Sequence, residues 1–248
     1  MDMQSVIVAG LGEVGAPLMR ILNRTYHCVG VDIQPVQVSG PCSVLHVCYP
    51  FQIPDFVATT RRYAARYMPE LIIINSTVAP GTTARVAAAA QVPVAYSPVR
   101  GKHAQMERDM IAYRKFVGAD DAATAAAARS HFERAGFRTG AFPSSAAGEA
   151  AKLLETTWLG ILVGWAQEVE RIADRYDATY EDVNAFFEEI GYLPHGIFPG
   201  VIGGHCVMPN IAILRSVLRS DFLDAVVKSN ALKTSEAPQL ALVGEAHG

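Results

Sequence analysis

The stretch SVIVAGLGEVGAPLMRILNR, residues 5–24, decides the fold of this 248-residue chain. It opens with a short, nearly continuous apolar run, which is typical of a buried β-strand. It closes with apolar residues three and four positions apart, from Val14 to Leu22, which predicts an amphipathic helix. We therefore expect a strand, a tight turn and a helix in immediate succession.

The turn between this strand and this helix has the pattern G-x-G-x-x-G, made by Gly10, Gly12 and Gly15. In a dinucleotide-binding fold the first glycine permits the turn, the second lets a pyrophosphate approach the backbone, and the third lets helix and strand pack closely. Glu13 and Val14 lead into the helix N-terminus, whose N–H groups favour phosphate. Alone this signal is weak, because glycine-rich turns are common.

A second apolar run, HCVGVDIQP, strengthens the signal because it contains Asp32. In dinucleotide-binding folds the acidic residue that contacts the adenosine ribose follows the glycines by about this number of residues. A carboxylate there accepts from both ribose hydroxyls and repels a 2′-phosphate, and no arginine or lysine follows within IQPVQVSG. NAD is therefore expected as the cofactor, rather than NADP. The remaining residues expected at the cofactor are Ile33, Tyr49, Pro50, Ser76 and Thr77.

Further apolar runs, SVLHVCYP, ELIIINST and VPVAYSP, alternate with helical stretches near residues 54–68, 80–90 and 120–136. This alternation predicts an α/β fold with a doubly wound parallel (Rossmann) sheet. We expect an NAD-binding domain at residues 1–143, a smaller α-helical domain at 144–232 that carries the catalytic residues, and a weakly structured tail at 233–248.

The composition excludes several classes of protein. Half of the residues are apolar, 18% are charged and the net charge is −3, so no nucleic-acid partner is expected. The N-terminus lacks the basic flank of a signal peptide, and no apolar run approaches the ~20 residues that span a bilayer. A cytoplasmic protein without a membrane partner is predicted. The four cysteines show no C-x-x-C or Cys/His spacing, so neither a disulfide framework nor a metal site is expected.

Residues 144–176, SSAAGEAAKLLETTWLGILVGWAQEVERIADRY, contain no proline and keep apolar residues at helical spacing. A helix of ~30 residues spans ~45 Å, which is longer than one side of a small domain. We therefore expect part of its apolar face to meet a second subunit, in a homodimer with a long dimerisation helix. Lys152 lies between Glu149 and Glu155 in its first turns, where a surface charge pair is the ordinary interpretation.

Late in the chain, GVIGGHCVMPN places Cys206 behind two glycines and a histidine. This motif, the glycine fingerprint, STVAPGTT, the Ser97-Pro98 pair and EAAKLLETTW occur in the order seen in the UDP-glucose/GDP-mannose dehydrogenase family. The sequence resembles that family over residues 4–215. The resemblance implies an NAD-dependent oxidoreductase that converts a primary alcohol of a nucleotide sugar to a carboxylate through two hydride transfers. Because the family's C-terminal nucleotide-binding domain does not follow, a truncated form is expected.

The resemblance also implies a role for each matching residue. Cys206 falls on the family's nucleophile, which adds to an aldehyde and gives a thiohemiacetal that is oxidised to a thioester. Lys152 falls on the catalytic lysine, whose cation would stabilise the oxyanion, and Thr77 on a threonine that positions water or a substrate hydroxyl. Gly203 and Gly204 would keep the cysteine loop close to the substrate. Beside the nucleophile, a protonated His205 would favour the thiolate, and a backbone-shaping role is the alternative.

Four positions depart from the family pattern. Val99 and His103 stand where members carry glutamates, Thr156 replaces an asparagine, and Asn210 replaces an aspartate and so removes a negative charge. The loss at Val99 puts thioester hydrolysis in doubt, because general-base assistance is worth ~10²–10⁴-fold. His103 is a candidate replacement base, since imidazole titrates near neutral pH.

The substrate is expected to be a sugar-like or nucleotide-sugar-like small molecule. Arg100, Lys102 and His103 in VRGKH form a small basic cluster that either holds a phosphate or carboxylate of this substrate or is a solvated loop.

Two alternatives to this function remain open. The lysine-bearing helix also resembles that of the β-hydroxyacid and 6-phosphogluconate dehydrogenases, which transfer a single hydride and need no cysteine. A non-catalytic NAD-binding dimer that acts as a sensor or scaffold is the other. The thiol argues against the scaffold, which has no physical need for one at that loop.

Overall fold

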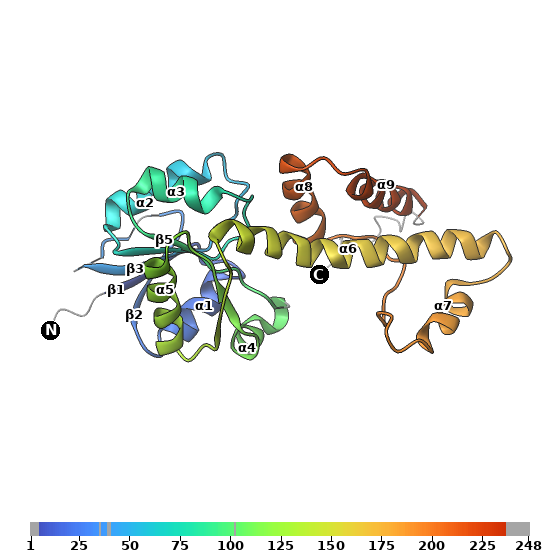
Figure 1. Ribbon diagram of the computed structural model, residues 1–248, viewed down its shortest axis with the longest axis horizontal. Coiled ribbons are helices and arrows are strands. Elements are labelled where there is room, and N and C mark those ends of the chain that lie inside the picture. The colour runs from blue at the N-terminus through green and yellow to red at the C-terminus, as the bar shows by residue number, and fades with distance from the viewer. Residues whose placement is uncertain (1–4, 35, 39–40, 102, 237–248) are drawn as a thin grey trace, which may run out of the picture. The chain divides into compact units, whose positions relative to one another are not determined.

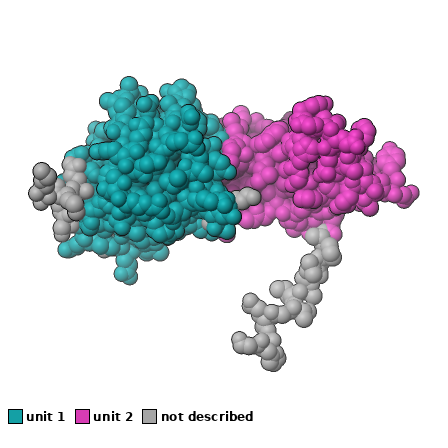
Figure 2. Space-filling view, turned by 90° about the horizontal axis from the view of Figure 1, so that it is seen from below, with its two compact units in different colours: residues 1–152 teal, residues 153–248 magenta. Residues whose placement is uncertain are grey.

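The computed structural model describes residues 5–34, 36–38, 41–101 and 103–236. The chain divides into two compact units, residues 1–152 and 153–248 (Figure 2). The first unit is an α/β domain and the second is helical.

The first unit is built on a five-stranded parallel sheet with the order β2-β1-β3-β4-β5. Its strands are β1 (Ser5–Ala9), β2 (His27–Val31), β3 (Cys42–Val47), β4 (Leu71–Ile74) and β5 (Val94–Tyr96). Because β1 pairs with β2 on one side and with β3 on the other, the winding reverses after β2. This confirms the doubly wound parallel sheet predicted from the alternation of apolar runs and helical stretches.

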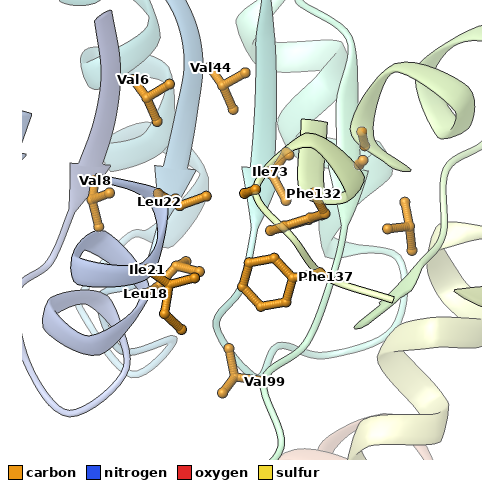
Figure 3. Close-up of a cluster of buried hydrophobic side chains, with 14 of the residues drawn as sticks. Val6, Val8, Leu18, Ile21, Leu22, Val44, Ile73, Val99, Phe132 and Phe137 are labelled. Atoms are coloured by element: carbon orange, nitrogen blue, oxygen red, sulfur yellow. The ribbon is translucent and has the colours of Figure 1, made fainter. Parts of the chain in front are cut away.

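Helices cover both faces of this sheet (Figure 1). They are α1 (Gly15–Leu22), α4 (Met106–Ala112) and α5 (Ala122–Arg134) on one face, and α2 (Phe56–Tyr67) and α3 (Thr82–Ala90) on the other. Since side chains alternate along a strand, Val6 and Val8 pack under α1 and α5 (Figure 3). Ile7 and Ala9 pack under α2 and α3. Burial on both faces explains why these strands are continuous apolar runs in the sequence.

Three short elements complete the first unit. They are the 3₁₀ turn η1 (His103–Gln105) and the parallel pair β6 (Lys115–Val117) and β7 (Thr139–Ala141). Gly118, which follows β6, forms an antiparallel bridge with Tyr96 at the end of β5. The strands β6 and β7 were not predicted, because neither lies in an apolar run as long as those of the five strands of the main sheet.

The second unit is formed by helices. The long helix α6 (Ser145–Asp174) starts in the first unit and confirms the proline-free helix expected from the sequence. It is followed by α7 (Tyr180–Glu188), α8 (Val207–Val217) and α9 (Asp221–Glu236). Residues 237–248 of the predicted tail lie outside the described residues.

Two apolar clusters hold the second unit together. Ala166 and Val169 of α6 pack against Tyr180 of α7, while Ile202, Ile211 and Val226 join α6, α8 and α9. None of the helices within the described ranges combines the length and apolar character needed to cross a bilayer.

Candidate functional site

The glycine loop lies where the winding of the sheet reverses. β1 ends at Ala9, between β2 and β3, and Gly10 follows directly. In doubly wound sheets, ligands bind in the crevice outside the carboxyl ends of the strands at this switch point. The candidate cofactor site of the first unit is therefore the loop from Gly10 to Gly15.

Each glycine of the loop meets a different local requirement. Gly10 has a φ of +90°, in the left-handed region that favours glycine. A Cβ on Gly15 would lie 1.7 Å from the carbonyl oxygen of Gly10, whereas a Cβ on Gly12 would have nothing within 4 Å. Helix α1 begins with no acidic residue in its first turn and no side chain capping it. The open backbone at Gly12 and the helix N-terminus fit a pyrophosphate.

Asp32 follows β2 and is held against this loop. The backbone N–H of Leu11 donates to its Oδ2 at 3.4 Å and that of Ile33 to its Oδ1 at 3.0 Å. A hollow of about 450 Å³ beside it is lined by Ile33, Thr59, Arg62, Tyr63 and Arg66. An exposed carboxylate at the glycine loop, next to a hollow lined by one apolar, one aromatic, one hydroxyl and two arginine side chains, fits an adenosine. The residues present thus fit a dinucleotide.

Other predicted cofactor residues lie at the ends of β3 and β4. The Ser76 hydroxyl, buried, donates to the carbonyl oxygens of Tyr49 at 2.6 Å and Val47 at 3.3 Å. The Tyr49 and Thr60 hydroxyls are 2.6 Å apart, and burial raises the pKa of Tyr49. Pro50 and the half-buried Thr77 follow these residues. The structure therefore brings the carboxyl ends of both strands together at the switch point.

The catalytic lysine expected from the resemblance, Lys152, is half-buried on α6, one turn after a fully buried carboxylate. That carboxylate, Glu149, accepts from Gly81 N at 2.6 Å, Thr83 N at 2.7 Å and the Thr83 hydroxyl at 2.7 Å. Glu149 therefore fastens the start of α6 to the N-terminus of α3. The sequence suggested only a surface charge pair here, because it does not show which glutamate is buried.

The structure shows where the side chains that follow the Ser97-Pro98 pair lie, which the sequence motif alone does not. The Val99 side chain is buried in the apolar cluster under α1 and α5 (Figure 3). Arg100 donates to the carbonyl oxygen of Arg114 at 2.7 Å and lies over the rings of Tyr113 and Phe116. The rings and this hydrogen bond therefore engage a face and one Nη atom of its guanidinium group. Lys102 lies outside the described residues, and His103 begins η1.

A buried polar chain that the sequence did not reveal supports the same segment. Lys115 Nζ donates to Ser97 O at 2.8 Å, Pro98 O at 3.0 Å and Asn75 Oδ1 at 3.2 Å. Asn75 Nδ2 then donates to His46 Nδ1 at 3.1 Å, and His46 Nε2 lies 2.9 Å from His131 Nε2. The available signal was a histidine in SVLHV and a lysine in RKFV, each inside an otherwise apolar strand.

In the second unit, Cys206 is exposed and occupies the N-cap position of α8. It follows the exposed Gly203, Gly204 and His205, and Gly204 has a φ of +77°. The thiol is therefore accessible to a reactant. This position suits a nucleophile.

Asn210 and Thr156, two of the four departures from the family pattern, form one contact. Asn210 Nδ2 donates to Thr156 Oγ1 at 2.9 Å, and the Thr156 hydroxyl donates to the carbonyl oxygen of Leu153 at 3.1 Å. This neutral pair connects α8 to α6 directly after the cysteine. Within the described residues, no cluster of three or more His, Cys, Asp or Glu side chains is arranged to hold a metal ion.

Comparisons with known proteins identify the fold. No family model and no curated protein sequence matches the chain. Among solved structures, the UDP-D-ManNAc dehydrogenase from Pyrococcus horikoshii matches with a TM-score of 0.82 and 19% identity, over 94% of this chain and 69% of the other. The UDP-glucose dehydrogenase from Pyrobaculum islandicum matches with 0.76 and 20%, over 93% and 68%.

The chain has the fold of a nucleotide-sugar dehydrogenase. A 3-hydroxyisobutyrate dehydrogenase from Mycobacterium tuberculosis is also similar, with a TM-score of 0.69 and 17% identity, over 96% of this chain and 94% of the other. The shared fold therefore extends to smaller dehydrogenases that this chain matches over nearly their full length.

Proposed function

We propose that this chain is an NAD-dependent dehydrogenase that acts on a CH–OH group of a sugar-like substrate. The observation that carries the proposal is the switch point of the sheet. There the open backbone at Gly12, the N-terminus of α1 and the Asp32 carboxylate together fit a dinucleotide. The fold shared with two nucleotide-sugar dehydrogenases over at least 93% of the chain supports it.

Bound NAD would supply the hydride acceptor. The residues of the chain would bind the cofactor and stabilise charge on the substrate. Asp32 would accept hydrogen bonds from the ribose hydroxyls, and the backbone at Gly12 would contact the pyrophosphate. Lys152 would stabilise negative charge on the substrate oxygen, near a water or hydroxyl positioned by Thr77. These roles rest on the resemblance and on the placement of each residue beside a strand end or on α6.

For a second oxidation we propose Cys206 as the nucleophile. Its thiolate would add to the aldehyde carbon, forming a C–S bond while the carbonyl oxygen becomes an oxyanion that takes up a proton. Its exposure and its N-cap position support this role. Gly203, Gly204 and His205 would shape the loop around it.

Release of a thioester would differ from the pattern of the resembled family. The Val99 side chain packs in the core, so that position offers substrate only its backbone. Asn210 bonds to Thr156 and carries no charge to activate a water. His103 is the base we propose in their place, and Arg100 with Lys102 the cationic contact for an anionic group of the substrate.

A single-hydride reaction is the second candidate function. The observation that favours it is the fold shared with the 3-hydroxyisobutyrate dehydrogenase, at a TM-score of 0.69. Such a reaction would use the cofactor site and Lys152 and would leave Cys206 without a chemical role.

NADH absorbance tests the proposal with UDP-glucose, UDP-N-acetylmannosamine, free sugars, sugar phosphates and 3-hydroxyacids as substrates. We expect NADH from a sugar substrate, loss of aldehyde oxidation in Cys206→Ser, and full activity in the control Cys28→Ala. Alcohol oxidation that is unchanged in Cys206→Ser would establish the single-hydride reaction instead. No NADH from any substrate, with NADH still bound, would favour the scaffold.

We also propose that the chain acts as a homodimer in the cytoplasm. Support for the dimer comes from a stripe of exposed apolar side chains on α6, formed by Leu154, Trp158, Trp165 and Ile172. The cytoplasmic location rests on the sequence alone.

A further inference from the structure

The loop that carries Cys206 is fastened to the second unit by a pair of buried amide side chains. Asn230 of α9 uses both of its polar atoms on one residue of this loop. The backbone N–H of Ile202 donates to Asn230 Oδ1 at 2.7 Å, and Asn230 Nδ2 donates to the carbonyl oxygen of Ile202 at 3.1 Å. The side chain therefore binds Ile202 as a neighbouring β-strand would.

A second amide, Gln167 of α6, holds the same loop two residues earlier. Its Nε2 donates to Gly200 O at 2.8 Å and to Asn230 Oδ1 at 3.3 Å, while its Oε1 accepts from the Ser229 hydroxyl at 3.0 Å. Gln167, Ser229 and Asn230 are each at most 7% exposed. All of these hydrogen bonds require the same orientations of the Gln167 and Asn230 amide groups, so a single arrangement satisfies them all.

The loop around these anchors is otherwise open. Gly200, Val201, Gly203, Gly204 and Cys206 are exposed, whereas Ile202 is buried. Gly203 and Gly204 have no atoms near enough to restrain a Cβ. Two glycines between Ile202 and Cys206 add conformational freedom to the backbone of this loop, which an anchor on either side reduces. The anchor at Ile202 and the start of α8 at Val207 supply the two fixed ends.

We infer that Asn230, assisted by Gln167, is a positioning residue that sets the location of the Cys206 thiol through the backbone of Ile202. This inference rests on the role proposed for Cys206. Asn230 touches neither substrate nor cofactor in this scheme. Its effect is to remove the freedom that Gly203 and Gly204 introduce, so that the thiol is held in place before the substrate arrives.

Asn230→Asp tests the inference with the change of a single atom. The new carboxylate oxygen would face the carbonyl oxygen of Ile202, so an attraction becomes a repulsion while the size of the side chain is kept. Hydrogen exchange followed by mass spectrometry should show the amides of residues 202–206 exchanging at least about tenfold faster, with the α6 and α7 amides unchanged. Asn184→Asp is the matched control, because Asn184 makes a solvent-exposed hydrogen bond to Glu188 on α7.

Kinetics give the second readout. With a substrate that the wild-type protein oxidises, kcat for the Cys206-dependent step should fall at least about tenfold in Asn230→Asp, while the NAD dissociation constant stays unchanged. Gln167→Glu removes the donor to Gly200 O and should give the same local change in exchange and in kcat. It tests the inference independently if Asn230→Asp does not fold.

Unchanged exchange at residues 202–206 in both variants would overturn the inference, as would a uniform increase across residues 153–236, which indicates general destabilisation. If the wild-type protein oxidises no substrate, the proposed function fails. The exchange experiment still decides whether the amide pair holds the loop.

Discussion

At the residue scale, two glycines of one loop serve different purposes. A Cβ on Gly15 would collide with the carbonyl oxygen of Gly10 at 1.7 Å, so its missing side chain is required by packing within the chain. Among the described residues, none beyond its chain neighbours lies within 4 Å of a Cβ on Gly12, and this glycine lacks a positive φ. Packing against the described residues does not require a glycine at that position, which fits the pyrophosphate contact that we propose for it.

Alanine at each position separates the two purposes. Gly12→Ala should unfold at the same temperature as the wild-type protein but bind NADH at least about tenfold more weakly, because the methyl group occupies the approach of the pyrophosphate. Gly15→Ala should lose ~1–3 kcal/mol of unfolding free energy through overpacking. Thermal unfolding and a fluorescence titration with NADH measure both effects. An equal loss of stability in the two variants would contradict this assignment.

At the scale of strands and helices, β3, the end of β4, β6 and α5 are connected by a series of buried hydrogen bonds. The donor and the acceptor of each bond in the series are determined. Lys115 donates to Asn75 Oδ1, which leaves the Asn75 amide to donate to His46 Nδ1. His46 therefore carries its proton on Nε2 and donates to His131. Both histidines are neutral in this arrangement. Burial lowers the pKa of His46, and it lowers the pKa of His131 to about 4 with a contribution from Arg134.

Burial also lowers the pKa of Lys115, from its usual 10.5 to about 7. Arg100 and Lys152 lower the pKa of Lys115 further, whereas Cys48 raises it. Between these two values the unfolded chain binds a proton that the folded chain has released. The contribution of Lys115 to the free energy of unfolding therefore rises with pH from about 7 to 10.5. Above about pH 9.0 the buried thiols of Cys28, Cys42 and Cys48, whose pKa values burial raises, oppose this rise. The same reasoning applies to the two histidines. Their contribution to the free energy of unfolding rises with pH in the acidic range, up to their ordinary pKa near ~6.5.

Lys115→Met should flatten the alkaline part of this dependence. One released proton contributes at most ~1.4 kcal/mol per pH unit, and the variant should lose that slope between pH 7 and 10.5 whatever its absolute stability. Urea unfolding at a series of pH values measures it. Lys228→Met, at an exposed lysine of α9, should keep the slope of the wild-type protein. A wild-type curve that is flat between pH 7 and 9.0, below the range where the buried thiols titrate in the unfolded chain, would refute the assignment.

Local features of this fold could be predicted from the sequence, whereas its long-range side-chain contacts could not. The parallel strands, the long helix and the glycine loop were predictable, because each has its own period or spacing within a few residues. The partners of Lys115, Glu149 and Asn230 were not, since each side chain meets a segment at least 17 positions away along the chain. Burial of Val99 was also hidden, because the Ser-Pro motif gives no direction for the next side chain.

At the scale of the whole molecule, the long helix leaves apolar surface uncovered. Leu154, Trp158, Trp165 and Ile172 are each at least 50% exposed, and their spacing of four and seven residues places them along one side of α6. Tryptophans exposed in a row are rare on monomeric proteins and mark association surfaces. A second copy of the chain is the partner we propose for this stripe.

Charge placed on the stripe should therefore separate the subunits. We expect the wild-type protein to have twice the 26.7 kDa mass of the chain in light scattering, and the Trp158→Glu and Trp165→Glu variants to shift toward the single mass. Burying an unpaired carboxylate in an apolar interface costs several kcal/mol, which is enough to dissociate a dimer at micromolar concentration. Phe186→Glu is the matched control, because Phe186 is 76% exposed on α7 and not on the stripe. If Phe186→Glu dissociates the protein and the tryptophan variants do not, the contact lies on another surface.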